Sequence, residues 1–255
     1  MLSPLTTEFI IQELHCFINI NNLLNSTIQF KEYKKKLFYW DLNKTFSLKY
    51  YNDKNFYDYI NSQVFYRNKQ LSIDLSGNNL ITDVSHLGNV HTLDLSYCDN
   101  ITDVSHLGNV HTLNLSHCYN ITDVSHLGNV HTLVLSYCDN LIDVSHLGNN
   151  HTLILYNSRK ITDVSNLGNV HTLSLSDCVN LIDVSNLGNV HNLDLCWCDN
   201  LIDVSHLGNN HTLKLSGCFN ITDVSNLGNV NTLHLYGCDG ITDISSLGNV
   251  HTLNI

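Results

Sequence analysis

Residues 90–109 read VHTLDLSYCDNITDVSHLGN, and residues 110–129 repeat them as VHTLNLSHCYNITDVSHLGN. Units of 20 residues continue in this way from residue 71 to residue 250 without an insertion or a deletion, and the fragment HTLNI follows at 251–255. A fixed period of this length is typical of solenoids, in which each unit forms one coil that packs against its neighbours. The sequence therefore predicts a repeat solenoid over residues 71–255.

The apolar spacing within one unit predicts how a coil is built. The segment TLDLS alternates like a short, half-buried strand. Val104 and Leu107 lie three residues apart, which suits one turn of 3₁₀ helix with both side chains inward, and Gly108 permits a tight return to the next unit. The side chains that we expect in the core of this coil are Val90, Leu93, Leu95, Cys98, Ile101, Val104 and Leu107.

These units resemble the leucine-rich repeat, whose strand segment reads L-x-x-L-x-L-x-x-N/C, and in particular its cysteine-containing type, in which C-x-x-I-T-D follows. The matching segments are CDNITD at 98–103, CYNITD at 118–123 and CFNITD at 218–223. The resemblance implies an α/β repeat, a leucine-rich-repeat solenoid with a parallel β-sheet on the concave face and a short 3₁₀ or irregular outer side.

Charge divides the chain at the start of the repeats. Residues 71–255 contain seventeen Asp, no Glu and three cations, Arg159, Lys160 and Lys214, which gives a net charge near −14. This balance disfavours nucleic acid and anionic membranes as partners and favours a protein partner. No apolar run is long enough to span a bilayer, and MLSPLTTEF lacks signal-peptide features, so we expect an intracellular, cytoplasmic protein.

Cysteine and histidine recur at fixed positions of the unit. Seven cysteines, from Cys98 to Cys238, share one position and are expected to be reduced structural thiols. Histidine forms two rows, one starting at His91 and one at His86. Imidazoles from successive coils can bind a divalent metal, but they can equally be polar turn residues copied with the repeat. We favour the second interpretation because Asn replaces histidine in the second row, as at Asn166, and therefore expect no metal and no cofactor.

Motifs of catalysis are absent from the sequence. It contains no nucleophile elbow, phosphate loop or zinc-protease motif, and its recurring aspartates share one solvent-facing environment. The chain is accordingly not predicted to be an enzyme, and no catalytic residue is assigned. The N-x-T triplets, such as that at Asn100, are interpreted as structural parts of the repeat turns.

Three positions of the unit vary between copies: the residue between the strand leucines and the residues on either side of the cysteine position. Strand alternation predicts that they lie on the concave face, where aromatic and acidic side chains would bind a protein; neutral drift on an unused face is the alternative. The predicted protein-binding residues are Asp94, Tyr97, Asp99, His117, Tyr119, Val134, Tyr137, Asp139, Ile154, Tyr156, Asp177, Asp194, Trp197, Asp199, Lys214, Phe219, His234 and Tyr236.

The N-terminal segment has three apolar runs with helical spacing, the last of them ending at Trp40. It resembles an F-box: LTTEF stands at 5–9, NNLL at 21–24, KEY at 31–33 and a Trp at 40. The chain thus resembles F-box/leucine-rich-repeat proteins of the kind found in giant DNA viruses and protists. The resemblance implies a substrate receptor of a cullin-RING (SCF-type) ubiquitin ligase, with adaptor contacts from Leu5, Ile10, Ile11, Leu14, Leu23 and Leu24.

The expected domains are an F-box-like helical segment at 1–45, a helical or irregular bridge at 46–70 and the repeats at 71–255. The alternative to the receptor is a plain interaction scaffold whose N-terminal helices only cap the solenoid. Because Ile255 ends the sequence within a strand, we also expect self-association or fraying at that edge.

Overall fold

The computed structural model describes residues 39–67 and 70–255, and the chain divides into two compact units, 1–75 and 76–255. In the described part of the first unit, strand β1 (Tyr39–Leu42) precedes helices α4 (Lys44–Asn52) and α5 (Lys54–Arg67) and strand β2 (Gln70–Asp74). β1 pairs with β2 in parallel. The predicted adaptor contacts, from Leu5 to Leu24, lie outside the described residues.

Polar side chains fix helix α4 of the first unit. Asn43 caps α4, its Oδ1 accepting a hydrogen bond from the Phe46 amide at 3.1 Å. The Ser47 hydroxyl donates to the carbonyl of Leu42 and accepts from the Asp74 amide, which ties α4 to the ends of both strands. The sequence prediction was wrong at Trp40, which lies in β1 rather than in a helix. Residues 39–42 form a strand because they pair with β2, which is remote in the sequence.

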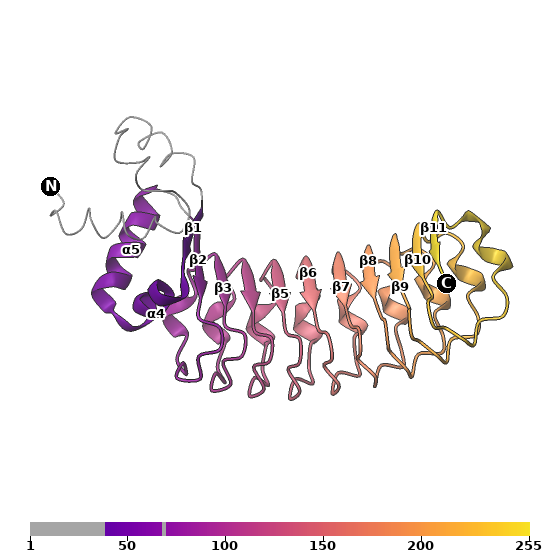
Figure 1. Cartoon of the computed structure of the whole chain (residues 1–255), viewed down its shortest axis with the longest axis horizontal. Coiled ribbons are helices and arrows are strands. Elements are labelled where there is room, and N and C mark those ends of the chain that lie inside the picture. Colours follow the sequence, from indigo (N-terminus) through magenta and orange to yellow (C-terminus); the bar gives the residue numbers. More distant parts are fainter. Residues whose placement is uncertain (1–38, 68–69) are drawn as a thin grey trace. The chain divides into compact units, whose positions relative to one another are not determined.

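The second unit is a leucine-rich-repeat solenoid, with one strand and one 3₁₀ helix in each coil (Figure 1). Its parallel strands pair in sequence order: β3 (Thr92–Asp94), β4 (Thr112–Asn114), β5 (Thr132–Val134), β6 (Thr152–Ile154), β7 (Thr172–Ser174), β8 (Asn192–Asp194), β9 (Thr212–Lys214), β10 (Thr232–His234) and β11 (Thr252–Asn254). Each residue pairs with the residue twenty positions on, as Leu93 does with Leu113. The predicted architecture is confirmed.

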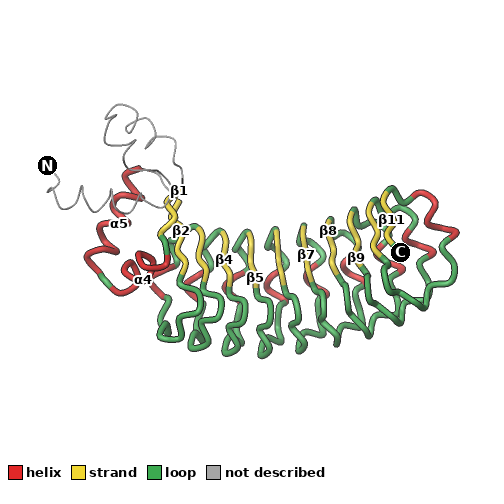
Figure 2. The backbone as a smooth tube through the Cα atoms, in the orientation of Figure 1, coloured by secondary structure: helices red, strands yellow, loops and turns green. Residues whose placement is uncertain are grey.

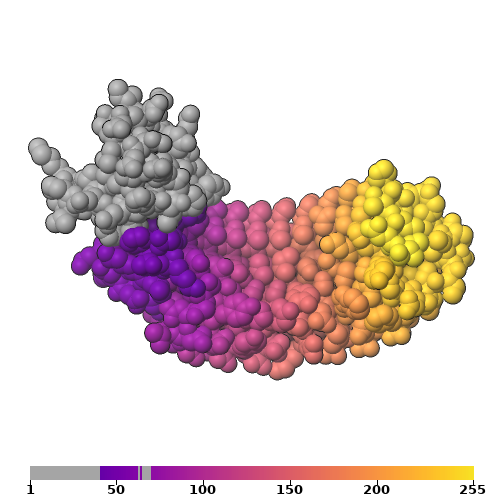
Figure 3. Space-filling view, in the orientation of Figure 1, coloured from indigo at the N-terminus to yellow at the C-terminus, as the bar shows by residue number. Residues whose placement is uncertain are grey.

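The 3₁₀ helices form a second row that runs alongside the row of strands (Figure 2). They are η2 (Ser85–Leu87), η3 (Ser105–Leu107), η4 (Ser125–Leu127), η5 (Ser145–Leu147), η6 (Ser165–Leu167), η7 (Ser185–Leu187), η8 (Ser205–Leu207), η9 (Ser225–Leu227) and η10 (Ser245–Asn249). In the space-filling view, successive coils appear as parallel ridges (Figure 3).

The predicted core positions are buried in the coil 90–109, with at most 2% of any of these side chains exposed. The equivalent apolar side chains are buried as far as Leu235, which places one continuous apolar column between the strands and the 3₁₀ helices, whereas Ile244 in the last coil is 45% exposed. Two coils have Asn150 and Asn210 where the others have valine, and both are 1% exposed.

The glycine that follows each 3₁₀ helix has a different role from the one predicted. Gly108 has φ −62°, a value open to any residue, so it is not needed for backbone freedom. Instead, a Cβ at Gly108 would collide with the carbonyl oxygen of His126 in the next coil. Glycine therefore allows adjacent coils to approach closely.

Candidate functional site

The outward side chains of the strands form a surface that we call the strand face. It consists of the two outward positions of each coil, residues 94 and 96 and their equivalents through 234 and 236. In every strand from β3 to β10 the residue between the leucines is half-buried, whereas the central leucine is buried. The predicted Asp94, Val134, Ile154, Tyr156, Asp194, Lys214, His234 and Tyr236 lie there.

The other predicted residues lie beside the strand face, on what we call the turn edge: residues 97 and 99 and their equivalents. Strand alternation does not extend this far, because each strand is only three residues long and the chain then turns on both sides of the cysteine. The placement of these residues on the sheet by alternation was therefore wrong. The predicted Tyr97, Asp99, His117, Tyr119, Tyr137, Asp139, Asp177, Trp197, Asp199 and Phe219 lie on the turn edge.

The residue before the cysteine position has a left-handed backbone in every coil from 77 to 237. Glycine, which adopts this conformation readily, occupies it at Gly77, Gly217 and Gly237, with φ between +67° and +76°. The remaining residues are non-glycine, with φ between +54° and +61°: Tyr97, His117, Tyr137, Asn157, Asp177 and Trp197. Asn and Asp tolerate this region, but Tyr, His and Trp adopt it at a cost of about 1–2 kcal/mol each.

Three of these side chains stack into what we call the aromatic column, namely Tyr97, His117 and Tyr137. Their ring centroids are 4.2 Å apart at both steps, with interplanar angles of 11° and 14°. Tyr119 meets the edge of His117, and its hydroxyl lies 2.9 Å from the His117 Nδ1. Tyr156, on the strand face, packs edge-on against Tyr137 with centroids 5.1 Å apart. The column is thus held in place from two sides.

A second aromatic group lies further along the turn edge. The Trp197 ring covers the backbone of Gly217 so closely that a Cβ there would lie 2.5–2.8 Å from its carbons. Phe219 packs edge-on against Trp197, and both side chains are about half exposed, at 47% and 50%. Nearby on the strand face, Lys214 and Asp194 form an ion pair at 3.3 Å.

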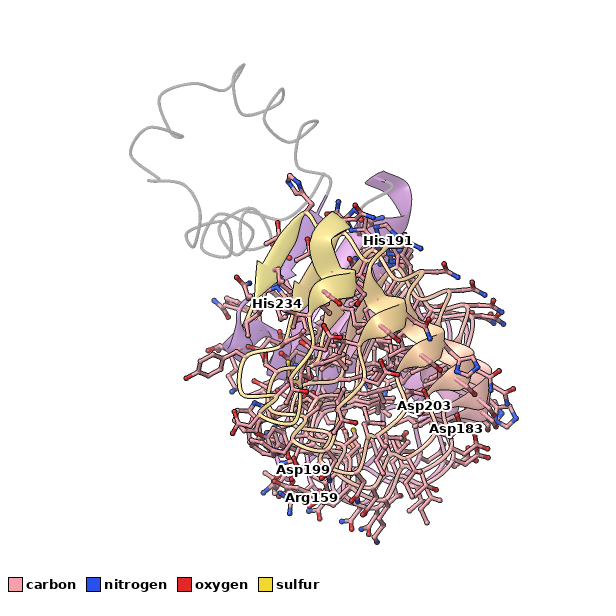
Figure 4. The ribbon with its side chains drawn as sticks, turned by 90° about the vertical axis from the view of Figure 1, so that its right-hand side faces the viewer. Arg159, Asp183, His191, Asp199, Asp203 and His234 are labelled. Atoms are coloured by element: carbon pink, nitrogen blue, oxygen red, sulfur yellow. The ribbon has the colours of Figure 1, made fainter. Side chains whose placement is uncertain are left out.

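The first histidine row lies at the entrance of the strands, where seven imidazoles stack from His91 to His211. Successive ring centroids are 4.5–4.7 Å apart. Burial, and then the charge of the neighbouring imidazoles, lowers the pKa of His131 and His191. Within residues 39–67 and 70–255, no group of three or more His, Cys, Asp or Glu side chains is placed to hold a metal ion. Viewed along the solenoid, His191 and Arg159 mark opposite sides of the stack (Figure 4).

The cysteine position forms a hydrogen-bonded ladder inside the coils. The Cys138 thiol donates to the carbonyl of Leu115 at 3.3 Å, and the Ser158 hydroxyl, which replaces cysteine in the next coil, makes the same bond to Leu135. Burial raises the pKa of the Cys138 thiol to about 12. No disulfide forms among the described cysteines, which are all free thiols.

Asparagine forms a matching ladder at the surface. The Asn120 side chain donates to the Asp99 carbonyl of the preceding coil at 2.7 Å, and Asn100, Asn140, Asn180, Asn200 and Asn220 make equivalent bonds. These bonds give the N-x-T triplets at 100, 120 and 220 a structural role.

On the outer side, the Asp103 carboxylate accepts a hydrogen bond from the Ser105 amide at 2.9 Å, and the same bond recurs in each coil. The hydrogen bonds from the Ser105 side chain and backbone lower the pKa of Asp103. Aliphatic side chains are exposed in this region where isoleucine replaces threonine, as at Ile182 and Ile202. This side is distinct from the turn edge in Figure 4, where Asp183 and Asp203 lie apart from Asp199.

Sequence reasoning missed three residues beside the aromatic column: Asn157, Arg159 and Lys160. With Tyr119, Tyr137 and Asp139 they line a hollow of about 340 Å³. Asn157 and Arg159 occupy variable positions beside the cysteine position but were not chosen as binding residues, and Lys160 was noted only as a rare cation in an acidic region. The adjacency of Arg159 and Lys160 in sequence, in the one coil whose cysteine is replaced by serine, was the available signal.

No protein-family model matches the chain, and no curated protein matches its sequence. Solved structures similar to it include an internalin (inlF) from Listeria monocytogenes, at 22% identity over 74% of this chain and 81% of that one, with a TM-score of 0.42. Internalin C2 (inlC2) from the same organism matches at 25% identity over 71% and 79%, with a TM-score of 0.44. A leucine-rich-repeat protein from Leptospira interrogans matches at 15% identity over 74% and 78%, with a TM-score of 0.28. These are likenesses of fold.

None of the helices in the described ranges is long and apolar enough to cross a membrane.

Proposed function

We propose that residues 76–255 form a non-catalytic module that binds another protein on the strand face and turn edge. The aromatic column carries this proposal. Glycine at residues 77, 217 and 237 serves the left-handed position without strain, yet Tyr97, His117 and Tyr137 occupy it with large rings. Stacking offsets part of the strain, about 0.5–1.5 kcal/mol per pair, so the column adds little net stability. Tyr97 is 53% exposed, and His117 and Tyr137 are half-buried. Aromatic side chains at the surface are the usual anchors of protein interfaces.

The test replaces the three column residues with the residue that other coils use. In the full chain, the combined substitution Tyr97→Gly, His117→Gly and Tyr137→Gly should not lower the free energy of unfolding by more than about 1 kcal/mol. Relief of strain at three residues, about 1–2 kcal/mol each, exceeds the stacking lost at two steps, about 0.5–1.5 kcal/mol each. Crosslinking in cells should then capture a protein with the original chain but not with the variant.

The matched control is Ile182→Thr, which places on the outer side the residue found in most other coils. It removes an exposed apolar side chain without touching the turn edge. Capture by the control and loss by the triple variant support the proposal. Equal capture by both would place the binding surface elsewhere.

We further propose that the bound protein is a substrate delivered to a cullin-RING ubiquitin ligase through an F-box at residues 5–40. This step rests on the resemblance of LTTEF, NNLL and KEY to the F-box pattern. The alternative is a scaffold without a ligase. Affinity purification of the full chain should recover a ligase adaptor, and Leu23→Asp with Leu24→Asp should abolish recovery without lowering the melting temperature of the repeats. Recovery of the repeat partner without any adaptor favours the scaffold.

A further inference from the structure

The aromatic column stops at a coil that supplies no ring. Tyr97, His117 and Tyr137 follow one another at 4.2 Å, and the next left-handed position holds Asn157. The hollow of about 340 Å³ begins there, with Tyr137, Tyr119 and Asn157 among its lining residues. The column therefore ends at a space that is large enough for one more ring.

Cations gather at this same hollow. Of the three cations in residues 71–255, Lys214 is paired with Asp194, whereas Arg159 and Lys160 both line the hollow. Arg159 donates from Nε to Asn157 Oδ1, and Lys160 donates from Nζ to Asn140 Oδ1, each at 2.8 Å. These partners are neutral amides. Among the described residues, no carboxylate lies within ion-pair distance of either cation.

The charge balance sets the kind of anion that fits. Arg159 and Lys160 contribute two positive charges, and Asp139 in the same lining contributes one negative charge. The hollow thus has a net charge of one positive within a region whose net charge is near −14. A single carboxylate matches this balance, whereas a phosphate dianion would exceed it and be repelled by Asp139 and the surrounding aspartates.

We propose that this hollow is the anchor site of the protein-binding surface, and that it takes an aromatic side chain of the partner with one carboxylate beside it. The ring continues the column on the face of Tyr137, in the place that Asn157 leaves open. The carboxylate accepts hydrogen bonds from Arg159 and Lys160. Asn157 is a positioning residue, because its amide oxygen orients the Arg159 guanidinium. This inference rests on the proposed function and names the feature of the partner that is recognised.

The test uses the full chain and N-acetyl-tryptophan, which combines one planar ring with one carboxylate. Titration followed by NMR should shift the Asn157 side-chain amide and the Tyr137 ring resonances, with a dissociation constant in the millimolar range. N-acetyl-tryptophanamide, which lacks the charge, should bind about threefold more weakly, as expected for exposed ion pairs. N-acetyl-aspartate, which lacks the ring, should bind more weakly still.

The decisive variant is Asn157→Tyr, which fills the vacant place with the chain's own ring and keeps both cationic residues, although Arg159 loses its hydrogen bond to Asn157. Tyrosine has the required backbone at residues 97 and 137, so the variant should fold. It should abolish the shift of the Tyr137 ring resonances, which are still present in the variant. The control is Gly237→Tyr, which adds a ring at the equivalent position four coils away, where a Cβ has room. It should leave the affinity unchanged.

Three results would overturn the inference: no shift with N-acetyl-tryptophan, equal binding by the amide, or unchanged binding to Asn157→Tyr. Tighter binding of O-phosphotyrosine than of N-acetyl-tryptophan would overturn the assignment of a single carboxylate. The proposed function is tested by a separate experiment. If the triple glycine variant still captures the partner, the interface lies elsewhere; if the variant loses the partner while the probe does not bind, only the anchor site is wrong.

Discussion

Replacing Asn150 with valine, the residue that seven other coils have at this position, should stabilise the repeats. Asn150 is 1% exposed and its Nδ2 donates to the carbonyls of Leu127 and Val130, the first at 3.0 Å. Among the described residues, nothing donates a hydrogen bond to its buried Oδ1. The Leu127 carbonyl also accepts the Val130 amide, so it keeps a partner after the substitution.

The magnitude follows from three contributions. Removing an unsatisfied buried oxygen gains about 2 kcal/mol, and burying a valine side chain gains about 1.5 kcal/mol. Losing two hydrogen bonds costs about 1 kcal/mol each. Asn150→Val should therefore raise the free energy of unfolding by about 1.5 kcal/mol. Asn210 makes the same bonds three coils away, roughly 14 Å at ~4.8 Å per coil, so the double substitution should be additive, at about 3 kcal/mol.

Urea unfolding of the full chain, followed by far-UV circular dichroism, measures the change. The midpoint should rise with an unchanged slope, since the exposed surface is the same. Val130→Asn is the reverse control and should lower the midpoint. A fall in the midpoint for Asn150→Val at constant slope would refute the reasoning, because the Asn150 amide would then be a net stabilising group.

Three other predictions follow from the ladders. Gly128→Ala should destabilise the chain by about 1–3 kcal/mol, since its Cβ would collide with the His146 carbonyl, whereas Gly248→Ala, with nothing within 4 Å, should be neutral or slightly stabilising in thermal unfolding. Acidification should lower the melting temperature in two steps. The first begins below pH 6.5, because the pKa of imidazoles such as His131 is lowered in the folded chain and the unfolded chain therefore binds protons first. The second begins below pH 3.8, because the pKa of carboxyls such as Asp103 is also lowered in the folded chain. A flat profile from pH 7 to pH 5 would contradict the first step. Iodoacetamide at pH 8 should leave Cys138 unmodified in the folded chain, because a pKa near 12 leaves about one thiolate in ten thousand, and mass spectrometry should find it alkylated only after unfolding.

The repeat period and apolar spacing were sufficient to predict the coil and its core. They could not predict β1, because residues 39–42 take their conformation from pairing with β2 rather than from a local pattern. They also misplaced Tyr97 and Asp99, since a three-residue strand ends before alternation reaches them. The left-handed backbone was hidden because only three of the copies hold glycine there. The hollow at Asn157 could not be predicted from the sequence, because it forms where the stack of rings ends at Tyr137 and the neighbouring coil supplies an asparagine.

The fit of Trp197 against Gly217 also bears on how the chain finds its correct pairing. Nearly identical coils carry little information about which coil belongs beside which, and a folding chain can seat one against the wrong neighbour with most contacts preserved. Trp197 removes part of this ambiguity, because its ring leaves no room for a Cβ in the coil that follows. With the ring in this orientation, a coil that has Tyr, His, Asn or Asp at that position would collide with it. The residues that differ between coils thus help to specify which coils lie side by side, whereas the residues common to every coil supply the packing that all coils share.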